Sequence, residues 1–397
     1  MKIYSERIYL PKGVIPGTIT VSDGKIISIE EGIKDPDAID YGTNRMIPGI
    51  FDTHNHGTCG FDPSNAQHLD KEQAKQQIRG YLKGLASQGV TSIFPTVVES
   101  DALSNIAEVA EEHEAIGAEI LGIHSEGPWL NRVGEKGIRT GWPEISVEKA
   151  KKMVADSKGW LKLVAIAPEI PGAYEVIEYF LSKGITVAAA HSDNHYKEAM
   201  EGYAKGISVA THLGNVMTDI HHRDVGGIGA GLLNDAVMCE MICDGMHNCN
   251  EMLQIYLKVK DHDKLMMISD CTPLSGAPVG KYTAFGMDVH ITEEGFVLTD
   301  TGRLLGSSQP VIYGIKNLVN NLHVPLEECL KMACLNPSKK YGFFDTKGTI
   351  ETGKDGDIVV IDDDYNILYT YSKGTLVYDK DTDGTIFNQS YIDAIRK

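Results

Sequence analysis

Two histidines separated by one residue, His54 and His56, follow the apolar run Met46–Phe51. In an extended segment, residues i and i+2 point the same way, so both imidazoles are expected to face one site. Two imidazoles on one face can bind a divalent metal ion. Such an ion polarises a carbonyl group and lowers the pKa of bound water, which is the chemistry of metal-assisted hydrolysis.

Polar residues that suit the same site end four further apolar runs of the sequence. They are Glu126, His191, His212 and Asp270. A single histidine at the end of a strand is more often structural than a metal ligand. Five runs that all end in such residues are not expected to arise by chance. Because the first run is followed by two histidines, the sequence predicts that six residues share one site.

Eight apolar runs supply a framework that could position these residues, and helical patterns alternate with them. The runs are Met46–Phe51, Thr91–Val98, Glu119–His124, Leu161–Ala167, Ile185–Ala190, Ile207–Thr211, Val237–Cys243 and Leu265–Ser269. Alternating strands and helices indicate βα units with parallel strands. Eight units fit an α/β fold of the (β/α)8 TIM-like barrel type, in which the C-terminal strand ends converge on the active site. A doubly wound open sheet is the alternative, but it does not explain why polar residues end so many runs.

The two ends of the chain have a different pattern, with short alternating segments and turns in residues 1–45 and 347–380. Each end is too short to bury a core alone, so we expect the two to pair in one small discontinuous β-sandwich domain. The predicted division is residues 1–47 and 346–397 for this domain and 48–345 for the barrel. A long insertion at 271–308 contains a predicted hairpin, Ala284–Ile291 with Gly295–Thr299, and is a candidate substrate element.

Composition excludes several classes of function. The 397 residues include 37 Lys and Arg against 55 Asp and Glu, a formal net charge of −18. A general nucleic-acid or anionic-membrane binder needs a basic surface, so neither partner is expected. The first residues lack the apolar region of a secretory signal, and no run approaches the length of a membrane span. The seven cysteines are irregularly spaced and contain no CxxC pair, which favours free thiols in the cytoplasm.

Several phrases resemble a known family. IPGIFDTHNHG at 47–57 and GTIETGKDGDIV at 348–359 resemble signatures of the amidohydrolase superfamily. Within it, HSEGPWLN, AAAHS, THLGNVM, ISDCTPLSG and LLGSS resemble the N-acetylglucosamine-6-phosphate deacetylase family. The resemblance covers nearly the whole chain, and the phrases fall in the family's order.

The resemblance implies roles for the predicted site residues. Glu126, His191 and His212 would hold a catalytic divalent metal, zinc or iron, with manganese and cobalt as alternatives. His54 and His56 match members with two metals, so one or two ions per subunit are implied. Asp270 would be the general acid and base that accepts a proton from water and delivers it to the leaving amine.

A second set matches positions that bind a substrate phosphate in the family. It comprises Asn215, the backbone at Val216, Arg223 and His247. Arg139, in a loop that lies close to the sugar site in the family, is a further candidate for substrate binding. The implied partner is a small phosphorylated N-acetyl amino sugar. Because part of the phosphate contact can come from a neighbouring subunit in the family, a homodimer is implied as well.

One loop departs from the family pattern, so the sequence does not decide which amino sugar is the substrate. Residues 135–143 read EKGIRTGWP, so Arg139 stands where the family usually has a histidine. N-acetylglucosamine 6-phosphate is the first expectation, and N-acetylgalactosamine 6-phosphate or a related amino-sugar phosphate is the alternative. Another amidohydrolase activity, a nucleobase deaminase and a non-catalytic binding protein are the remaining hypotheses.

Overall fold

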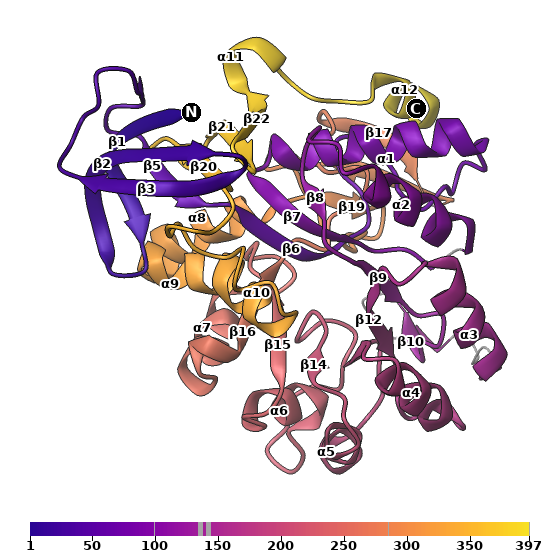
Figure 1. Ribbon diagram of the computed structural model, residues 1–397. Helices are drawn as coiled ribbons and strands as arrows, with labels where there is room; N and C mark the ends of the chain where they lie inside the picture. The colour runs from indigo at the N-terminus through magenta and orange to yellow at the C-terminus, as the bar shows by residue number, and fades with distance from the viewer. Residues whose placement is uncertain (99, 134–137, 140–143, 285, 397) are drawn as a thin grey trace.

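The structure is a computed structural model that describes the chain apart from residues 99, 134–137, 140–143, 285 and 397. It has two main parts, parallel strands surrounded by helices and a sheet built from both ends of the chain (Figure 1). None of the described helices combines the length and apolar character needed to cross a membrane.

The eight predicted runs all contain strands, and these strands pair in parallel. Six form one sheet in the order β16-β15-β14-β13-β12-β9, and three form another in the order β6-β7-β8. Their bounds are β6 (Ile50–Asn55), β7 (Val90–Pro95), β8 (Glu119–Ile120), β9 (Ile123–Glu126), β12 (Leu161–Ile166), β13 (Thr186–Ala189), β14 (Val209–Ala210), β15 (Met238–Ile242) and β16 (Leu265–Ile268). The α/β class with parallel strands is confirmed.

Backbone links on both sides connect the two parallel sheets. Thr96, just after β7, forms a parallel bridge with His124 of β9. At the other side, the amide of Asp270 donates to the carbonyl oxygen of His54 at 2.9 Å, which joins the region after β16 to β6. These links bring the C-terminal ends of β6, β9 and β16 together.

Helices separate successive parallel strands along the chain and lie around the strands in Figure 1. They are α1 (Lys71–Ala86), α2 (Ser100–Glu112), α3 (Val147–Asp156), α4 (Ala173–Ser182), α5 (Tyr196–Ala204), α6 (Gly226–Leu233), α7 (Asn250–Val259) and α8 (Val311–Leu322). The start of α1 illustrates the local cause: the Asp70 side chain accepts from the amide of Gln73, whose own side chain accepts from the Asp70 amide. This reciprocal cap satisfies amides that have no partner within the helix.

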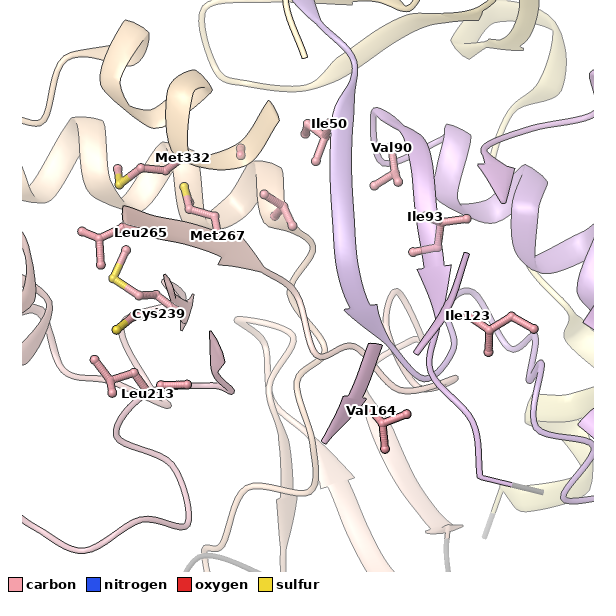
Figure 2. Packing of buried hydrophobic residues seen from close by; sticks show 14 of the residues in the cluster. Ile50, Val90, Ile93, Ile123, Val164, Leu213, Cys239, Leu265, Met267 and Met332 are labelled. Atoms are coloured by element: carbon pink, nitrogen blue, oxygen red, sulfur yellow. The ribbon is translucent and has the colours of Figure 1, made fainter. Parts of the chain in front are cut away.

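The core between strands and helices is continuous and apolar. Figure 2 shows Leu265 and Met267 of β16 beside Met332 of the helical segment that follows α9 (Leu326–Leu330). On the neighbouring strands, Ile50 and Val90 are also buried in this cluster. Burial of apolar area stabilises this arrangement by roughly 25 cal/mol per Å².

Strands from the two ends of the chain form one eight-stranded mixed sheet. Its order is β22-β21-β20-β5-β1-β2-β3, with β4 beside β1. The bounds are β1 (Lys2–Leu10), β2 (Gly13–Ser22), β3 (Lys25–Glu31), β4 (Ile39–Asp40), β5 (Arg45–Pro48), β20 (Ile358–Ile361), β21 (Ile367–Ser372) and β22 (Thr375–Asp379). The expected pairing of the two ends is present through β5 and β20. The described terminal strands lie in this single sheet, so a two-sheet sandwich stays a prediction.

The insertion after β16 forms a three-stranded antiparallel sheet of β17 (Gly280–Ala284), β18 (Met287–Ile291) and β19 (Val297–Thr299). The predicted hairpin corresponds to β18 and β19, whereas the sequence pattern did not separate β17 from β18. The remaining short elements are β10 (Arg132–Val133), β11 (Ile138–Arg139), η1 (His262–Lys264), η2 (Lys331–Leu335), α10 (Asn336–Lys340), α11 (Lys380–Asp383) and α12 (Gln389–Ile395).

Candidate metal centre

The six residues predicted from the ends of the apolar runs converge in the structure. His54 lies in β6 and Glu126 ends β9. His191, His212 and Asp270 each stand two residues beyond the last residue of β13, β14 and β16. Because the strands are parallel, their C-terminal ends meet at the same edge, as expected for catalytic residues of this fold class.

Glu126 is the centre of the cluster. Its Oε1 lies 3.0 Å from His191 Nε2 and 2.9 Å from His212 Nε2, and its Oε2 lies 3.0 Å from His56 Nε2. His54 Nε2 lies 3.6 Å from Oε1. One carboxylate therefore faces four imidazoles, three near Oε1 and one near Oε2.

Asp270 approaches the histidine pair from β16. Its Oδ1 lies 3.4 Å from Nε2 of both His54 and His56. Burial opposes ionisation of this carboxyl, but the His54 and His56 imidazoles outweigh burial and lower the pKa of Asp270 below its usual range. Asp270 is consequently a carboxylate that can accept a proton.

Three of the converging residues adopt a backbone conformation that is rare for residues with side chains. His191, His212 and Asp270 have φ of 49°, 31° and 52°. Left-handed conformations of non-glycine residues cost free energy and persist where the surrounding structure enforces them, commonly at functional sites. Here they turn the side chains inward directly after the strand ends.

The donor set fits a divalent cation. Two groups, His54–His56–Glu126 and Glu126–His191–His212, each have ligand atoms within 4.8 Å of one another. Imidazole nitrogens with a carboxylate oxygen are ligands that zinc and iron accept. Within each pair the imidazole Nε2 atoms lie only 3.3 Å or 3.2 Å apart.

The pKa shifts in the cluster also indicate that its carboxylates, Glu126 and Asp270, need positive charge beside them. Burial lowers the pKa of His56, but Asp270 and Glu126 outweigh it and raise that pKa to about 9. The same surroundings lower the pKa of Glu126 through His54 and His191, against the effect of burial. Either protonated imidazoles or bound cations can balance these carboxylates, and cations leave all four imidazoles as ligands.

Residues behind the cluster hold the imidazoles in place. His191 Nδ1 lies 2.6 Å from the carbonyl oxygen of Arg132, and His54 Nδ1 lies 3.5 Å from Oε2 of the buried Glu240. Such outer contacts fix which ring nitrogen faces a metal. Glu240 was not among the predicted site residues, although a charged residue inside the apolar run Val237–Cys243 was a usable signal.

The aspartate of the first motif has a connecting role. Asp52 accepts from the hydroxyl of Ser269 at 2.5 Å and from the side chain of Asn55 at 3.3 Å. It thereby joins β6, which carries His54, to the end of β16, which precedes Asp270. The pKa of Asp52 is raised to about 6, chiefly by its burial.

A cavity of about 660 Å³ opens over the cluster. Asn215, Val216 and His247 line it together with His56, Glu126, His191, His212 and Asp270, whereas His54 is buried behind the lining. Residues that the sequence analysis missed also line it: Met246, Thr272, Met287, Arg303, Leu304, Leu305 and Gly306. The signal available for the last of these was the LLGSS phrase.

One predicted phosphate contact, Arg223, does not line this cavity. Arg223 is exposed beside His222, 2.8 Å from its Nε2, and lines a separate surface depression with His195. Arg223 does not line the cavity of its own chain, and its role in substrate binding stays a prediction. The side chain of Arg139 lies outside the described residues, as does most of the 135–143 loop.

His124 is also placed away from the cavity lining. It is buried behind His54, with ring centroids 4.5 Å apart. Burial and the charge on His54 lower its pKa well below the usual value. A direct contact of His124 with a substrate oxygen is thus not favoured by this geometry.

Comparisons with known proteins agree on one family. A model described as the Amidohydrolase family matches residues 45–377. The chain is 33% identical over 373 residues to N-acetylglucosamine-6-phosphate deacetylase of Vibrio furnissii, covering 92% of this chain and 91% of that one. It is 28% identical over 369 residues to N-acetylgalactosamine-6-phosphate deacetylase of Escherichia coli O157:H7, covering 90% and 94%.

A solved structure has the same overall arrangement. The N-acetylglucosamine-6-phosphate deacetylase of Pasteurella multocida superposes with a TM-score of 0.83 at 27% identity. The match covers 95% of this chain and 99% of that one.

Proposed function

The chain belongs to the amidohydrolase family and, within it, to the N-acetylglucosamine-6-phosphate deacetylases, and from this premise we propose that it hydrolyses the acetamide of N-acetyl-D-glucosamine 6-phosphate to D-glucosamine 6-phosphate and acetate. The observation that carries the proposal is the convergence of four imidazoles on Glu126 with Asp270 beside them. The proposed metal ligands and the proposed proton carrier thus lie in one cluster.

The residues that would hold the metal fall into two groups that share Glu126. His191 and His212 with Glu126 would hold one divalent cation, zinc or iron, and His54 and His56 with Glu126 would hold a second. When bound, a divalent cation polarises the amide carbonyl and lowers the pKa of water near it. Manganese and cobalt are further candidates for the same donors.

Asp270 is the proposed proton carrier. Its carboxylate accepts a proton as the water oxygen attacks the acetamide carbon. It then gives that proton to the sugar nitrogen as the C–N bond breaks, so the amine leaves uncharged together with acetic acid. Acetic acid loses the remaining proton of the water and is released as acetate. The lowered pKa of Asp270 keeps it ionised before the reaction, which this role requires.

The phosphate is proposed to bind in the same cavity. His247 lines it, and its Nδ1 lies 2.6 Å from Oδ2 of Asp244, which fixes the orientation of the ring. Asn215 and Val216 also line the cavity. Imidazole and amide donors are suited to phosphate oxygens.

The position of Arg223 supports a homodimer. Its guanidinium is exposed and lies outside the cavity of its own chain. We propose that it reaches the cavity of a second copy, so that each phosphate site is completed by the partner. Self-complementary pairs of this kind are the commonest form of oligomer.

For the fold, we propose that the parallel strands close into a (β/α)8 TIM-like barrel over residues 48–345. The bridge from Thr96 to His124 and the bond from Asp270 to His54 support closure. The pairing of β5 with β20 supports a separate β-domain of residues 1–47 and 346–397.

N-acetylgalactosamine 6-phosphate is the second candidate substrate. Two observations support this candidate. The 135–143 loop has Arg139 in place of the family's histidine. One similar protein is named N-acetylgalactosamine-6-phosphate deacetylase. The test is a panel of N-acetyl hexosamines, with and without the 6-phosphate, assayed for acetate release by protein of known metal content. We expect the phosphorylated glucosamine derivative to have the highest kcat/KM. Equal rates on phosphorylated and unphosphorylated sugars would reject the proposed phosphate site.

A further inference from the structure

Glu240 is a charged residue in the middle of a buried strand. It is the third residue of β15, between Cys239 and Met241, and its side chain is fully buried. A carboxylate in such surroundings is unfavourable unless a charged or hydrogen-bonding partner compensates it. Its presence therefore calls for an explanation in terms of what it contacts.

Its contacts lead directly to the candidate metal centre. The hydroxyl of Thr53 donates to Oε1 at 3.2 Å, and Oε2 lies 3.5 Å from Nδ1 of His54. Among the described residues, His54 provides the only ion-pair contact of Glu240. The carboxylate thus acts on the cluster through one imidazole.

The contact determines how the His54 ring is presented. With Nδ1 carrying the proton toward Glu240, the lone pair of Nε2 faces Glu126 at 3.6 Å and Asp270 at 3.4 Å. The opposite tautomer would place an N–H in the cluster and leave the buried carboxylate facing a lone pair. The arrangement therefore selects Nε2 as the ligand atom.

The two ligand groups differ in what stands behind them. His191 Nδ1 is held by the neutral carbonyl oxygen of Arg132 at 2.6 Å, and His212 Nδ1 is buried with no hydrogen-bond partner among the described residues. Only the group containing His54 has a carboxylate behind its imidazole in the described part of the chain. That carboxylate adds negative charge to the side of the cluster that would take the second cation.

We propose that Glu240 is a positioning residue that orients His54 and adds the charge needed for a second divalent cation at His54–His56–Glu126, so that it decides whether the centre holds two cations or one. The inference rests on the proposed function only in taking the cluster as a metal site. It names no new step of the reaction.

The test measures metal content rather than activity. Wild-type protein and Glu240→Gln are stripped with a chelator, reloaded with zinc, desalted and analysed for zinc per chain. We expect two ions in the wild type and one in Glu240→Gln, with the affinity for the second ion lowered about 10- to 100-fold in a chelator competition. Thr53→Val is the matched control, because it removes the other contact of the same carboxylate but keeps its charge, and it should retain two ions.

A second variant guards against a misfolded Glu240→Gln protein. Glu240→Asp keeps the charge but draws it away from His54, so it should hold two ions with the second bound more weakly than in the wild type. Wild-type affinity for two ions in both variants, or a single ion in the wild type, would overturn the inference. Failure of the proposed function would be separate, since it requires that fully loaded wild-type protein releases no acetate.

Discussion

At the scale of single residues, the proposed role of Asp270 in proton transfer leads to the most direct prediction. Asp270→Asn keeps the size of the side chain but removes the carboxylate that carries the proton. We expect kcat for acetate release to fall about 10²- to 10⁴-fold, the usual contribution of general acid–base catalysis. Metal content should stay at the wild-type value, and normal turnover by the metal-loaded variant would show that another group moves the proton.

The proposed role of His247 leads to a prediction about binding of the substrate phosphate rather than about catalysis. His247→Ala removes the imidazole that Asp244 orients toward the cavity. We expect KM for the sugar phosphate to rise about tenfold or more, as for loss of a hydrogen bond to a charged group, with a smaller change in kcat. The unphosphorylated sugar should be affected little, and an equal loss on both sugars would remove His247 from the phosphate site.

The residues at the metal centre could be predicted because their signal is local. His54, Glu126, His191, His212 and Asp270 each follow an apolar run, and parallel strands bring such ends together. Glu240 was missed because its partner, His54, is distant in the sequence and only packing joins them. Arg223 follows the THLGNVM phrase closely in sequence, but it lines a surface depression outside the cavity of its own chain, so its role stays a prediction.

At the scale of elements, Lys347 joins the terminal sheet to the parallel strands. It is almost fully buried, and its Nζ lies 2.6 Å from Glu119 of β8, 2.9 Å from Asp355 and 2.7 Å from Asp357. Burial lowers the pKa of Lys347, but Asp357 and Glu119 outweigh it and raise that pKa above its usual value. The charge is therefore kept in the buried position.

Removing this charge should destabilise the contact between the two parts. Lys347→Met leaves buried carboxylates without their cation, a change that typically costs about 3–5 kcal/mol. We expect a clear fall in the midpoint of urea unfolding. Lys373→Met is the control, because Lys373 is half exposed and pairs with the same Glu119, and its effect should be small. Similar losses in both variants would contradict this account.

The elements themselves were largely predictable from periodicity. The alternation of apolar runs with helical patterns located all the parallel strands, while the run Met46–Phe51 divides into β5 of the terminal sheet and β6 of the parallel strands. That division occurs at Pro48 and Gly49, where a Cβ on Gly49 would lie 2.0 Å from Oγ1 of Thr91. Apolarity is continuous across the change of sheet, so this run by itself does not separate β5 from β6.

At the scale of the whole molecule, the proposed dimer predicts complementation between two inactive variants. Arg223→Ala keeps Asp270, and Asp270→Asn keeps Arg223. If Arg223 acts in the partner's cavity, mixed dimers contain one intact site, and random exchange should restore about a quarter of wild-type activity. The measurement is acetate release after subunit exchange, with each variant alone as the control. No recovery, or a monomer in solution, would reject the shared site.

The net charge of −18 agrees with this local view of anion binding. Global charge governs solubility and long-range steering, whereas a substrate phosphate is held by a few donors in one cavity. His247 lies beside a cluster that would carry one or two divalent cations. An acidic protein can therefore bind an anionic sugar at this one place.

The most direct test of the central claim is a metal titration of the stripped protein, with acetate release from N-acetylglucosamine 6-phosphate measured at each ratio of bound zinc or iron to chain. We expect acetate release to be lost on stripping, to rise in proportion to the bound metal and to disappear again on chelation. Acetate release at the wild-type rate by protein shown to be free of metal would contradict the account.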